Sequence, residues 1–395
     1  MILLIYDFFT HSLGWKLPIV FTYYSTRMIL AALTSLILSI FLGSYFIRKL
    51  YEFKIGQTVR SEDYGLIGKL HANKKDTPTM GGVLILFTML VSMLLWMDLQ
   101  HPFTLLFFLT TVILGLAGGY DDYKKIRHKN VKGLSGRKKL LIQAFVSSLV
   151  VLYMFVPAVS EWLHHGDWFV PPVIKQGHTE ISLSQYASLL YVPFVKGPFL
   201  NFTGLCVIFV VILAFLVIMG SSNSVNLTDG LDGLAAGCLI LVASTLALFA
   251  FLSNHIEFAR YLNIAYIEGS GEIAIYLCAF AGGCLGFLWY NGFPAQVFMG
   301  DVGSLTLGGI LGVATVLLKR ELLLAIIGGI FVSEAMSVIL QVASFRWRNQ
   351  KRIFLCAPLH HHFEYLGWPE TKVVLRFWII GLLLALVGIA SLKFQ

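Results

Sequence analysis

Long apolar runs, separated by short polar connections, recur along this sequence. A helix needs about 20 apolar residues to cross the roughly 30 Å hydrocarbon core of a bilayer. Ten runs approach that length, at about 28–47, 81–97, 103–120, 140–157, 203–220, 233–253, 273–289, 305–318, 322–342 and 373–392. Only 13% of the residues are charged, too few to cover a soluble protein of 395 residues. The sequence therefore predicts an all-α polytopic membrane protein, with about ten transmembrane helices in a single domain over residues 1–395.

The positions of lysine and arginine predict how these helices are oriented. Connections after the odd-numbered runs hold 20 Lys and Arg residues, whereas the other connections and the termini hold 8. Because basic residues concentrate on the cytoplasmic side of membrane proteins, we expect both termini on the periplasmic, outer side. The net charge of +8 is explained by these short loops, so we expect a lipid bilayer and no nucleic acid as a partner.

Five aspartates stand at the ends of apolar runs, all on the predicted cytoplasmic side. They are Asp121, Asp122, Asp229, Asp232 and Asp301. Carboxylates next to hydrocarbon are costly, so such a group indicates a functional site. Together with nearby lysines they suggest a magnesium-dependent cleft for an anionic phosphate substrate.

Each acidic motif has a structural alternative. Asp121 and Asp122 precede Lys125 by one helical turn, but an acid pair can also simply end a helix. Capping explains one polar residue before the sixth run, but hardly four within the seven positions 226–232, which hold Asn226, Thr228, Asp229 and Asp232. Asn223 lies one helical turn before Asn226. Asp301 is interpreted as a metal ligand. Phe298 could stack on a flat base or pack in the core.

Two basic motifs lie in the same predicted cytoplasmic region. Histidine can bind phosphate, move protons or ligate metal, and the last cytoplasmic loop holds His360, His361 and His362. A zinc site with Cys356 and solvated loop histidines are the alternatives. Lys74 and Lys75, before the second run, could meet a pyrophosphate or an anionic lipid head group, and Thr79 belongs to a turn that leads into this run. Glu334, within the ninth run, is expected first to have a hydrogen-bonded packing role and second to support the site.

Two further patterns concern architecture. The outer loop 158–202 contains Pro171-Pro172 and the alternating segment "TEISLSQY", which predict a short hairpin. Glycine pairs four residues apart predict close helix packing at 115/119, 282/286 and 308/312.

The motifs "TPTMGG", "DDYKK", "NLTDGLDGLA", "FMGDVGSL" and "PLHHHFE", in this order, resemble those of the polyprenyl-phosphate N-acetylhexosamine-1-phosphate transferases. The resemblance covers about 28–392, and "TPTMGG" with the histidine string favours the muramoyl branch. It implies transfer of phospho-MurNAc-pentapeptide from UDP-MurNAc-pentapeptide to undecaprenyl phosphate, giving lipid I and UMP with Mg²⁺. It also implies a multi-pass protein of the bacterial cytoplasmic membrane and suggests a homodimer.

The resemblance assigns expected roles to the residues. Asp301 would ligate Mg²⁺, and Asp121 would act as the base, with Asp122 and Lys125 beside it. Uridine or magnesium-side contacts are expected from Asn226, Asp229, Asp232 and Phe298, with Asn223 and Asn291 as weaker candidates. Nucleotide or phosphate contacts are expected from Lys74, Thr79 and His361, supported by His360 and His362.

Several alternatives stay open from the sequence. Direct attack by the lipid phosphate is preferred over a double displacement through an aspartyl-phosphate. A GlcNAc-1-phosphate transferase is the nearest different activity. An anionic-solute transporter is the alternative from another class, although its charged groups should lie near the membrane midplane.

Overall fold

A computed structural model describes residues 1–12, 14, 18–53, 77–127 and 133–393 of the chain. Within these residues, nine helices are long and apolar enough to cross a membrane. They are α2 (Tyr24–Glu52), α5 (Pro102–Arg127), α6 (Gly136–Phe155), α9 (Val207–Thr228), α10 (Leu234–Ser253), α12 (Ser270–Asn291), α13 (Gly300–Leu317), α15 (Gly329–Trp347) and α17 (Glu370–Ala390). The shorter apolar helix α4 (Gly82–Trp96) is the tenth. The prediction of an all-α polytopic membrane protein is confirmed.

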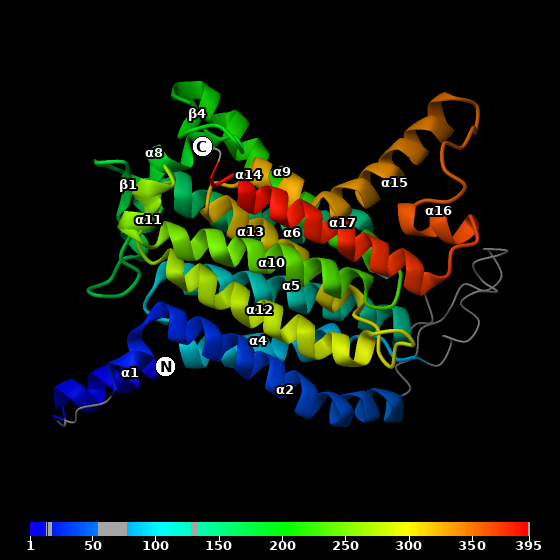
Figure 1. Cartoon of the computed structure of the whole chain (residues 1–395), viewed down its shortest axis with the longest axis horizontal. Coiled ribbons are helices and arrows are strands. Elements are labelled where there is room, and N and C mark those ends of the chain that lie inside the picture. Colours follow the sequence, from blue (N-terminus) through cyan, green and yellow to red (C-terminus); the bar gives the residue numbers. More distant parts are fainter. Residues whose placement is uncertain (13, 15–17, 54–76, 128–132, 394–395) are drawn as a thin grey trace.

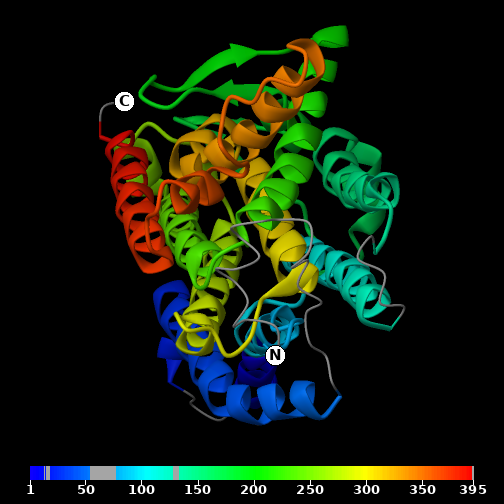
Figure 2. The ribbon, with the colours of Figure 1, turned by 90° about the vertical axis from the view of Figure 1, so that its right-hand side faces the viewer.

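The helices form one elongated bundle around α13 and α12, which are the most buried of the long helices (Figure 1). Figure 2 looks along the bundle from the end that carries the short helix α16 (Leu359–Tyr365). Both chain termini lie toward the opposite end, as expected for an even number of crossings (Figure 1). Which end faces the cytoplasm stays a prediction.

The ninth predicted span is not one helix. The chain forms α14 (Glu321–Ile327), leaves helical geometry at Gly328 (φ −92°, ψ 19°) and resumes as α15. Two successive glycines, Gly328 and Gly329, carry no side chains that would hold the helix straight across this point. α15 consequently leans out of the bundle before the chain returns through α16 (Figure 1).

Close helix crossings occur at two of the three predicted glycine pairs. A Cβ on Gly282 or Gly308 would lie 2.2 Å from Ala32 O or 2.5 Å from Ser221 O, so only glycine permits these approaches of α12 to α2 and of α13 to α9. On α5 the tightest position is Gly118, whose Cβ would lie 2.4 Å from Asp301 O. The predicted Gly119 makes only an ordinary contact, 3.7 Å from Val302 Cγ2.

Short elements cover the end of the bundle that carries the termini. The hairpin predicted in 158–202 is confirmed as antiparallel β1 (Ile174–Gln176) and β2 (Thr179–Ile181), and β5 (Tyr266–Ile267) pairs with β1. A second pair joins β3 (Leu189–Tyr191) to β4 (Pro198–Asn201). The other short elements are α1 (Ile2–Asp7), η1 (Phe8–Ser12), η2 (Ile19–Thr22), α7 (Pro157–Leu163), α8 (Leu183–Ala187), η4 (Gly204–Cys206) and α11 (Ile256–Tyr261).

A buried ion pair ties α2 to α12 at this same end. Arg27 Nη1 lies 2.7 Å from Glu272 Oε1 and donates to Trp96 O at 3.1 Å. The second carboxylate oxygen of Glu272 accepts the backbone N–H of Asp98 at 2.9 Å, and the guanidinium lies over the ring of Tyr24. Each partner's charge is thus neutralised locally, as burial requires.

Candidate active site

Three aspartates from two helices meet at the end of the bundle opposite the termini. Asp121 and Asp122 lie near the C-terminal end of α5, and Asp301 lies in the first turn of α13. The close approach at Gly118 brings the two helices together here. One carboxylate oxygen from each residue lies within 4.8 Å of the others, and Asp121 and Asp122 are buried. The prediction that these motifs gather at one end is therefore confirmed by the fold.

Two lysines neutralise most of this negative charge. Because α5 continues to Arg127, Lys125 lies on the aspartate face, with Nζ 2.7 Å from Asp121 Oδ2 and 2.9 Å from Asp301 Oδ2. Lys139, in the first turn of α6, lies 2.9 Å from Asp121 Oδ2 and 2.5 Å from Asp301 Oδ2. Both ammonium groups therefore bridge carboxylates from different helices.

Backbone and amide donors fix the remaining oxygens. Asp121 Oδ1 accepts the N–H of Leu134, and Asp122 Oδ2 accepts the N–H of Val302 at 3.1 Å. Asn226 Nδ2 donates to Asp301 Oδ1 at 2.9 Å. The predicted residue Asn226 is thus in direct contact with the carboxylate cluster.

The turn between α9 and α10 lies against the start of α13. Asp229 accepts the backbone N–H of Gly300, and burial, with the negative charge of Asp301, raises the pKa of its carboxyl to about 7. Asp232 faces a different loop, because its Oδ2 accepts the N–H of Ala295 at 3.0 Å. The two aspartates of this motif therefore hold different segments: Asp229 contacts the start of α13, and Asp232 contacts the loop before it.

Two of the weaker candidates direct their donors at protein atoms. Asn291 Nδ2 donates to Val297 O at 2.8 Å, and its Oδ1 accepts the N–H of Gly233 at 3.0 Å. Asn223 donates to Gln143 Oε1 at 2.8 Å and to Met219 O at 2.7 Å. These contacts hold loops and helices together, and a substrate contact for either residue stays a prediction.

The segment before α4 is pinned against the segment before α13. Phe298 donates its N–H to Pro78 O and accepts the N–H of Gly81, both at 2.8 Å. Thr79 is buried beside Gly300, whose positive φ of 73° and lack of a side chain allow this approach. Lys74 lies outside the described residues.

The three predicted histidines lie on α16, each with a different partner. The N–H and Nδ1 of buried His360 both lie 3.1 Å from the carboxylate of Glu334, which confirms the expected hydrogen-bonded packing of this acid. His361 Nδ1 lies 2.6 Å from Glu364 Oε2. His362 Nδ1 accepts the N–H of Leu355 at 3.2 Å.

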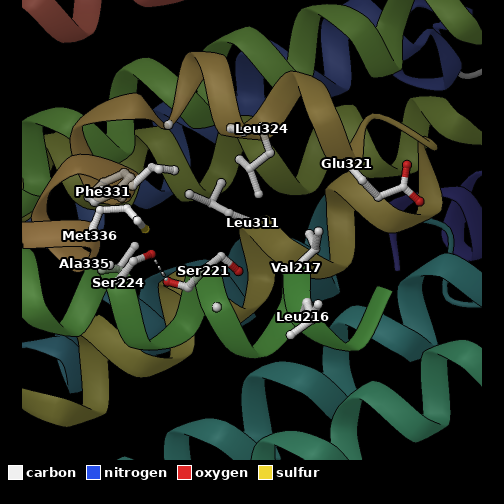
Figure 3. Close-up of a pocket in the computed structure, with 15 residues that line it drawn as sticks. Leu216, Val217, Ser221, Ser224, Leu311, Glu321, Leu324, Phe331, Ala335 and Met336 are labelled. Carbon is white, nitrogen blue, oxygen red and sulfur yellow. Dashed lines mark hydrogen bonds between the residues drawn. The ribbon is translucent and has the colours of Figure 1, made fainter. Parts of the chain in front are cut away.

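An apolar groove runs along α9 (Figure 3). It has a volume of about 220 Å³ and lies between α9, α13 and the broken pair α14–α15. Its lining residues are Leu216, Val217, Gly220, Ser221, Ser224, Val225, Leu311, Glu321, Leu324, Ala325, Gly328, Phe331, Val332, Ala335 and Met336. Val225, one of the lining residues, directly precedes Asn226, which contacts Asp301.

Lys139 is the main site residue that the sequence did not single out. Its signal was the basic run "GRKK" at the start of a span, but such runs are common on the cytoplasmic side of any membrane protein. Gln143, one turn further along α6, was also missed. It donates to Ser222 Oγ at 2.9 Å and so links α6 to α9.

The donor set of the cluster fits a hard divalent cation. Carboxylate oxygens are the ligands that magnesium and calcium prefer, and the three aspartates offer one oxygen each within reach of one ion. Among the described residues this is the one group of three or more such ligands, so Cys356 and the histidines do not form a zinc site there. A cation at the cluster would compete with Lys125 and Lys139 for the same oxygens.

The fold is that of an integral membrane protein with a carboxylate cluster at one end, and comparison with known proteins identifies its class as a glycosyl transferase. The family model of glycosyl transferase family 4 matches residues 104–319. This match begins in α5 and ends just after α13, so it contains all three cluster aspartates. A signature of phospho-N-acetylmuramoyl-pentapeptide-transferases matches residues 74–86.

Similar curated proteins identify the family within this class of transferases. The chain is 63% identical to the phospho-N-acetylmuramoyl-pentapeptide-transferase of Protochlamydia amoebophila, with 100% of each chain covered. It is 45% identical to that of Desulfotalea psychrophila and 43% identical to that of Koribacter versatilis, over 99% and 95% of each chain. The chain belongs to the phospho-N-acetylmuramoyl-pentapeptide-transferase family.

Proposed function

We propose that this protein transfers phospho-MurNAc-pentapeptide from UDP-MurNAc-pentapeptide to undecaprenyl phosphate in the bacterial cytoplasmic membrane, giving lipid I and UMP. The observation that carries the proposal is the lysine-bridged cluster of three aspartates in a chain of this family. One substrate is a lipid and the other is water-soluble. A site at one end of the helices is accessible to both.

Mg²⁺ is the proposed cofactor, held by Asp301 with Asp121 and Asp122 in reach. When bound, it would neutralise charge on the pyrophosphate of the nucleotide sugar. Lys125 and Lys139 are also well placed to stabilise negative charge, since phosphoryl transfer depends mainly on positioning and electrostatics.

In the proposed direct route, an oxygen of the carrier phosphate forms a bond to the sugar-bearing phosphorus. The bond from that phosphorus to UMP breaks, and UMP leaves. Asp121 is proposed to accept any proton that remains on the carrier phosphate, and Lys125 and Lys139 hold its carboxylate in place. An aspartyl-phosphate double displacement is the alternative, and a phosphoenzyme trapped with the nucleotide substrate alone would decide for it.

Asn226, Asp229, Asp232 and Phe298 are proposed to meet the nucleotide, as are Lys74, Thr79 and the histidines of α16. Asn226 and Asp229 have the strongest support, because both lie directly against the start of α13. The polyprenyl chain is proposed to lie partly in the apolar groove, whose lining residues are mostly hydrophobic. A homodimer is also expected.

Two alternatives are less well supported. A GlcNAc-1-phosphate transferase would use a similar cluster, and a panel of nucleotide sugars distinguishes it. An anionic-solute transporter would need its charged groups near the midplane. The cluster instead lies at the last turns of α5 and the first turn of α13.

The decisive experiment measures lipid I formation by the purified protein with both substrates, with and without Mg²⁺, for the wild type and Asp301→Asn. Magnesium-dependent product that the variant loses supports the activity and the metal role together. Product from both proteins would remove Asp301 from the metal site. No product from a folded wild type would contradict the activity.

Ala335→Phe tests the lipid half of the proposal. A benzyl group would fill part of the apolar groove, so the KM for undecaprenyl phosphate should rise several-fold while the KM for the nucleotide sugar stays unchanged. The matched control is Ile339→Phe, on an exposed part of α15 outside the groove. Equal KM values for undecaprenyl phosphate in both variants would show that the polyprenyl chain binds outside this groove.

A further inference from the structure

Glu334 is a fully buried acid, and among the described residues its carboxylate forms hydrogen bonds with His360 alone. It lies on α15, and its Oε1 accepts the backbone N–H of His360 at 3.1 Å. Its Oε2 lies 3.1 Å from Nδ1 of the same histidine. Two contacts from one carboxylate to one residue fix both the position and the ring orientation of that residue.

These contacts select one tautomer of His360. An ionised carboxylate has acceptors and no donor, so its contact with Nδ1 requires that Nδ1 carries a ring hydrogen. Nε2 is then a bare acceptor. It is buried and has no hydrogen-bond partner among the described residues.

The bare nitrogen faces the turn between α9 and α10. A Cβ built on Gly230 would lie 2.3 Å from His360 Nε2, so the ring nitrogen lies directly against the glycine Cα hydrogens. A lone pair fits this contact, whereas an Nε2–H hydrogen would collide with the turn. The Nδ1–H tautomer is therefore the one compatible with this packing.

The turn connects this contact to the cluster. Gly230 follows Asp229, which accepts the N–H of Gly300, and Gly300 immediately precedes Asp301. A displacement of the turn would thus move Asp229 relative to Asp301. A shift of about 1 Å near reacting groups can lower a rate on the order of 100-fold.

We propose that Glu334 is a positioning residue of this active site: it holds His360 in the Nδ1–H tautomer, and the bare Nε2 then sets the position of the Asp229–Gly230 turn. The catalytic consequence rests on the proposed transfer reaction. The tautomer and the packing do not, so they can be tested separately.

The first test is Glu334→Gln, studied by nitrogen-15 NMR of histidine-labelled protein and by steady-state kinetics. The glutamine amide can donate to Nδ1, which would move the ring hydrogen to Nε2. We expect the NMR signature of His360 to switch tautomer and kcat to fall on the order of 10-fold to 100-fold, with a much smaller change in the nucleotide KM. Glu334→Asp, which keeps the acceptor, should restore the Nδ1–H signature and part of kcat.

The matched control is Glu272→Gln, another buried glutamate, whose partner is Arg27 at the opposite end of the bundle. It should leave the His360 signature unchanged. An unchanged tautomer and kcat in Glu334→Gln overturn the proposal. A tautomer switch in a protein that makes no lipid I would support the positioning role and contradict the transfer reaction instead.

A double-mutant cycle tests the packing without any activity measurement. Gly230→Ala places a methyl group into His360 Nε2 and should lower the thermal unfolding midpoint by several degrees. The same substitution in a His360→Ala background should cost clearly less, because the collision is gone. Equal costs in both backgrounds would show that His360 does not set the turn.

Discussion

Three carboxylates within 4.8 Å of one another repel strongly unless cations lie between them. At an effective dielectric constant near 20, each pair of charges at this distance costs roughly 3 kcal/mol. Lys125 and Lys139 relieve this repulsion because each contacts both Asp121 and Asp301. The carboxylates of Asp121 and Asp301 can therefore lie close together before any substrate arrives.

At this scale we predict that Lys139→Gln lowers kcat/KM on the order of 100-fold, because the cluster loses a bridging cation and a stabiliser of phosphate charge. The neighbouring Lys138 is exposed and makes no ion pair among the described residues, so Lys138→Gln should behave as wild type. Steady-state lipid I formation measures both. Equal activities of the two variants would contradict a role for Lys139.

The residues of the site were predictable where chemistry alone identifies them. Aspartates at the ends of apolar runs are costly, so Asp121, Asp122 and Asp301 stood out from the sequence. Lys139 did not, because a lysine near a membrane has an ordinary explanation and only the crossing of α5, α6 and α13 brings it to the cluster.

At the scale of the helical elements, the crossing of α5 and α13 positions the cluster. The crossing depends on Gly118, where a Cβ would lie 2.4 Å from the carbonyl oxygen of Asp301. Backbone atoms cannot move aside as flexible side chains can. A side chain at position 118 must therefore separate the two helices at the residue that carries the central carboxylate.

Gly118→Ala should destabilise the protein by about 1–3 kcal/mol and reduce activity, because it overpacks this crossing. Gly119→Ala provides the matched control, since its Cβ would lie 3.7 Å from Val302 Cγ2, an ordinary contact. Thermal unfolding in detergent and lipid I formation report on the two effects. A larger loss in Gly119→Ala than in Gly118→Ala would contradict this account.

The elements were predictable to the extent that apolar length defines them. All ten predicted runs correspond to helical segments, but 322–342 breaks into α14 and α15. Hydropathy continues across Gly328, so the pattern contains no signal for the break. The backbone geometry of two adjacent glycines, rather than composition, creates this feature and with it one wall of the apolar groove.

At the scale of the whole molecule, two native cysteines lie at opposite ends. Cys206 is exposed in η4, at the end that carries the termini, and Cys356 is partly buried in the loop before α16. If the termini are periplasmic, a membrane-impermeant thiol reagent should label Cys206, but not Cys356, in right-side-out vesicles.

In permeabilised vesicles the reagent should label both Cys206 and Cys356. Cys206→Ser should remove the labelling seen in sealed vesicles. Burial raises the pKa of the Cys356 thiol, so mildly alkaline conditions suit this step. The reverse pattern in sealed vesicles would show that the predicted orientation is wrong.

The buried ion pair between Arg27 and Glu272, at the end of the bundle opposite the aspartate cluster, should contribute to the stability of the folded protein without affecting the reaction. Arg27→Met leaves a buried carboxylate without its cation and should cost about 3–5 kcal/mol of unfolding free energy, with activity per folded molecule unchanged. Lys49→Met removes an exposed pair on the same helix and should have no measurable effect. Thermal unfolding of both variants measures the difference. Similar unfolding midpoints for Arg27→Met and Lys49→Met would show that the buried pair does not stabilise the protein more than the exposed pair.

The shortness of α4 has a consequence for the depth of the reaction. Its 15 residues rise about 22 Å, clearly less than the roughly 30 Å of bilayer hydrocarbon. With the other end of α4 at the membrane surface, the start of α4, next to Thr79 and the beginning of α13, would be recessed from the opposite surface. Water and a soluble nucleotide would have to enter to a level at which the surrounding lipid is still acyl chain. The carrier's phosphate would in turn be drawn below the plane of its neighbours' head groups.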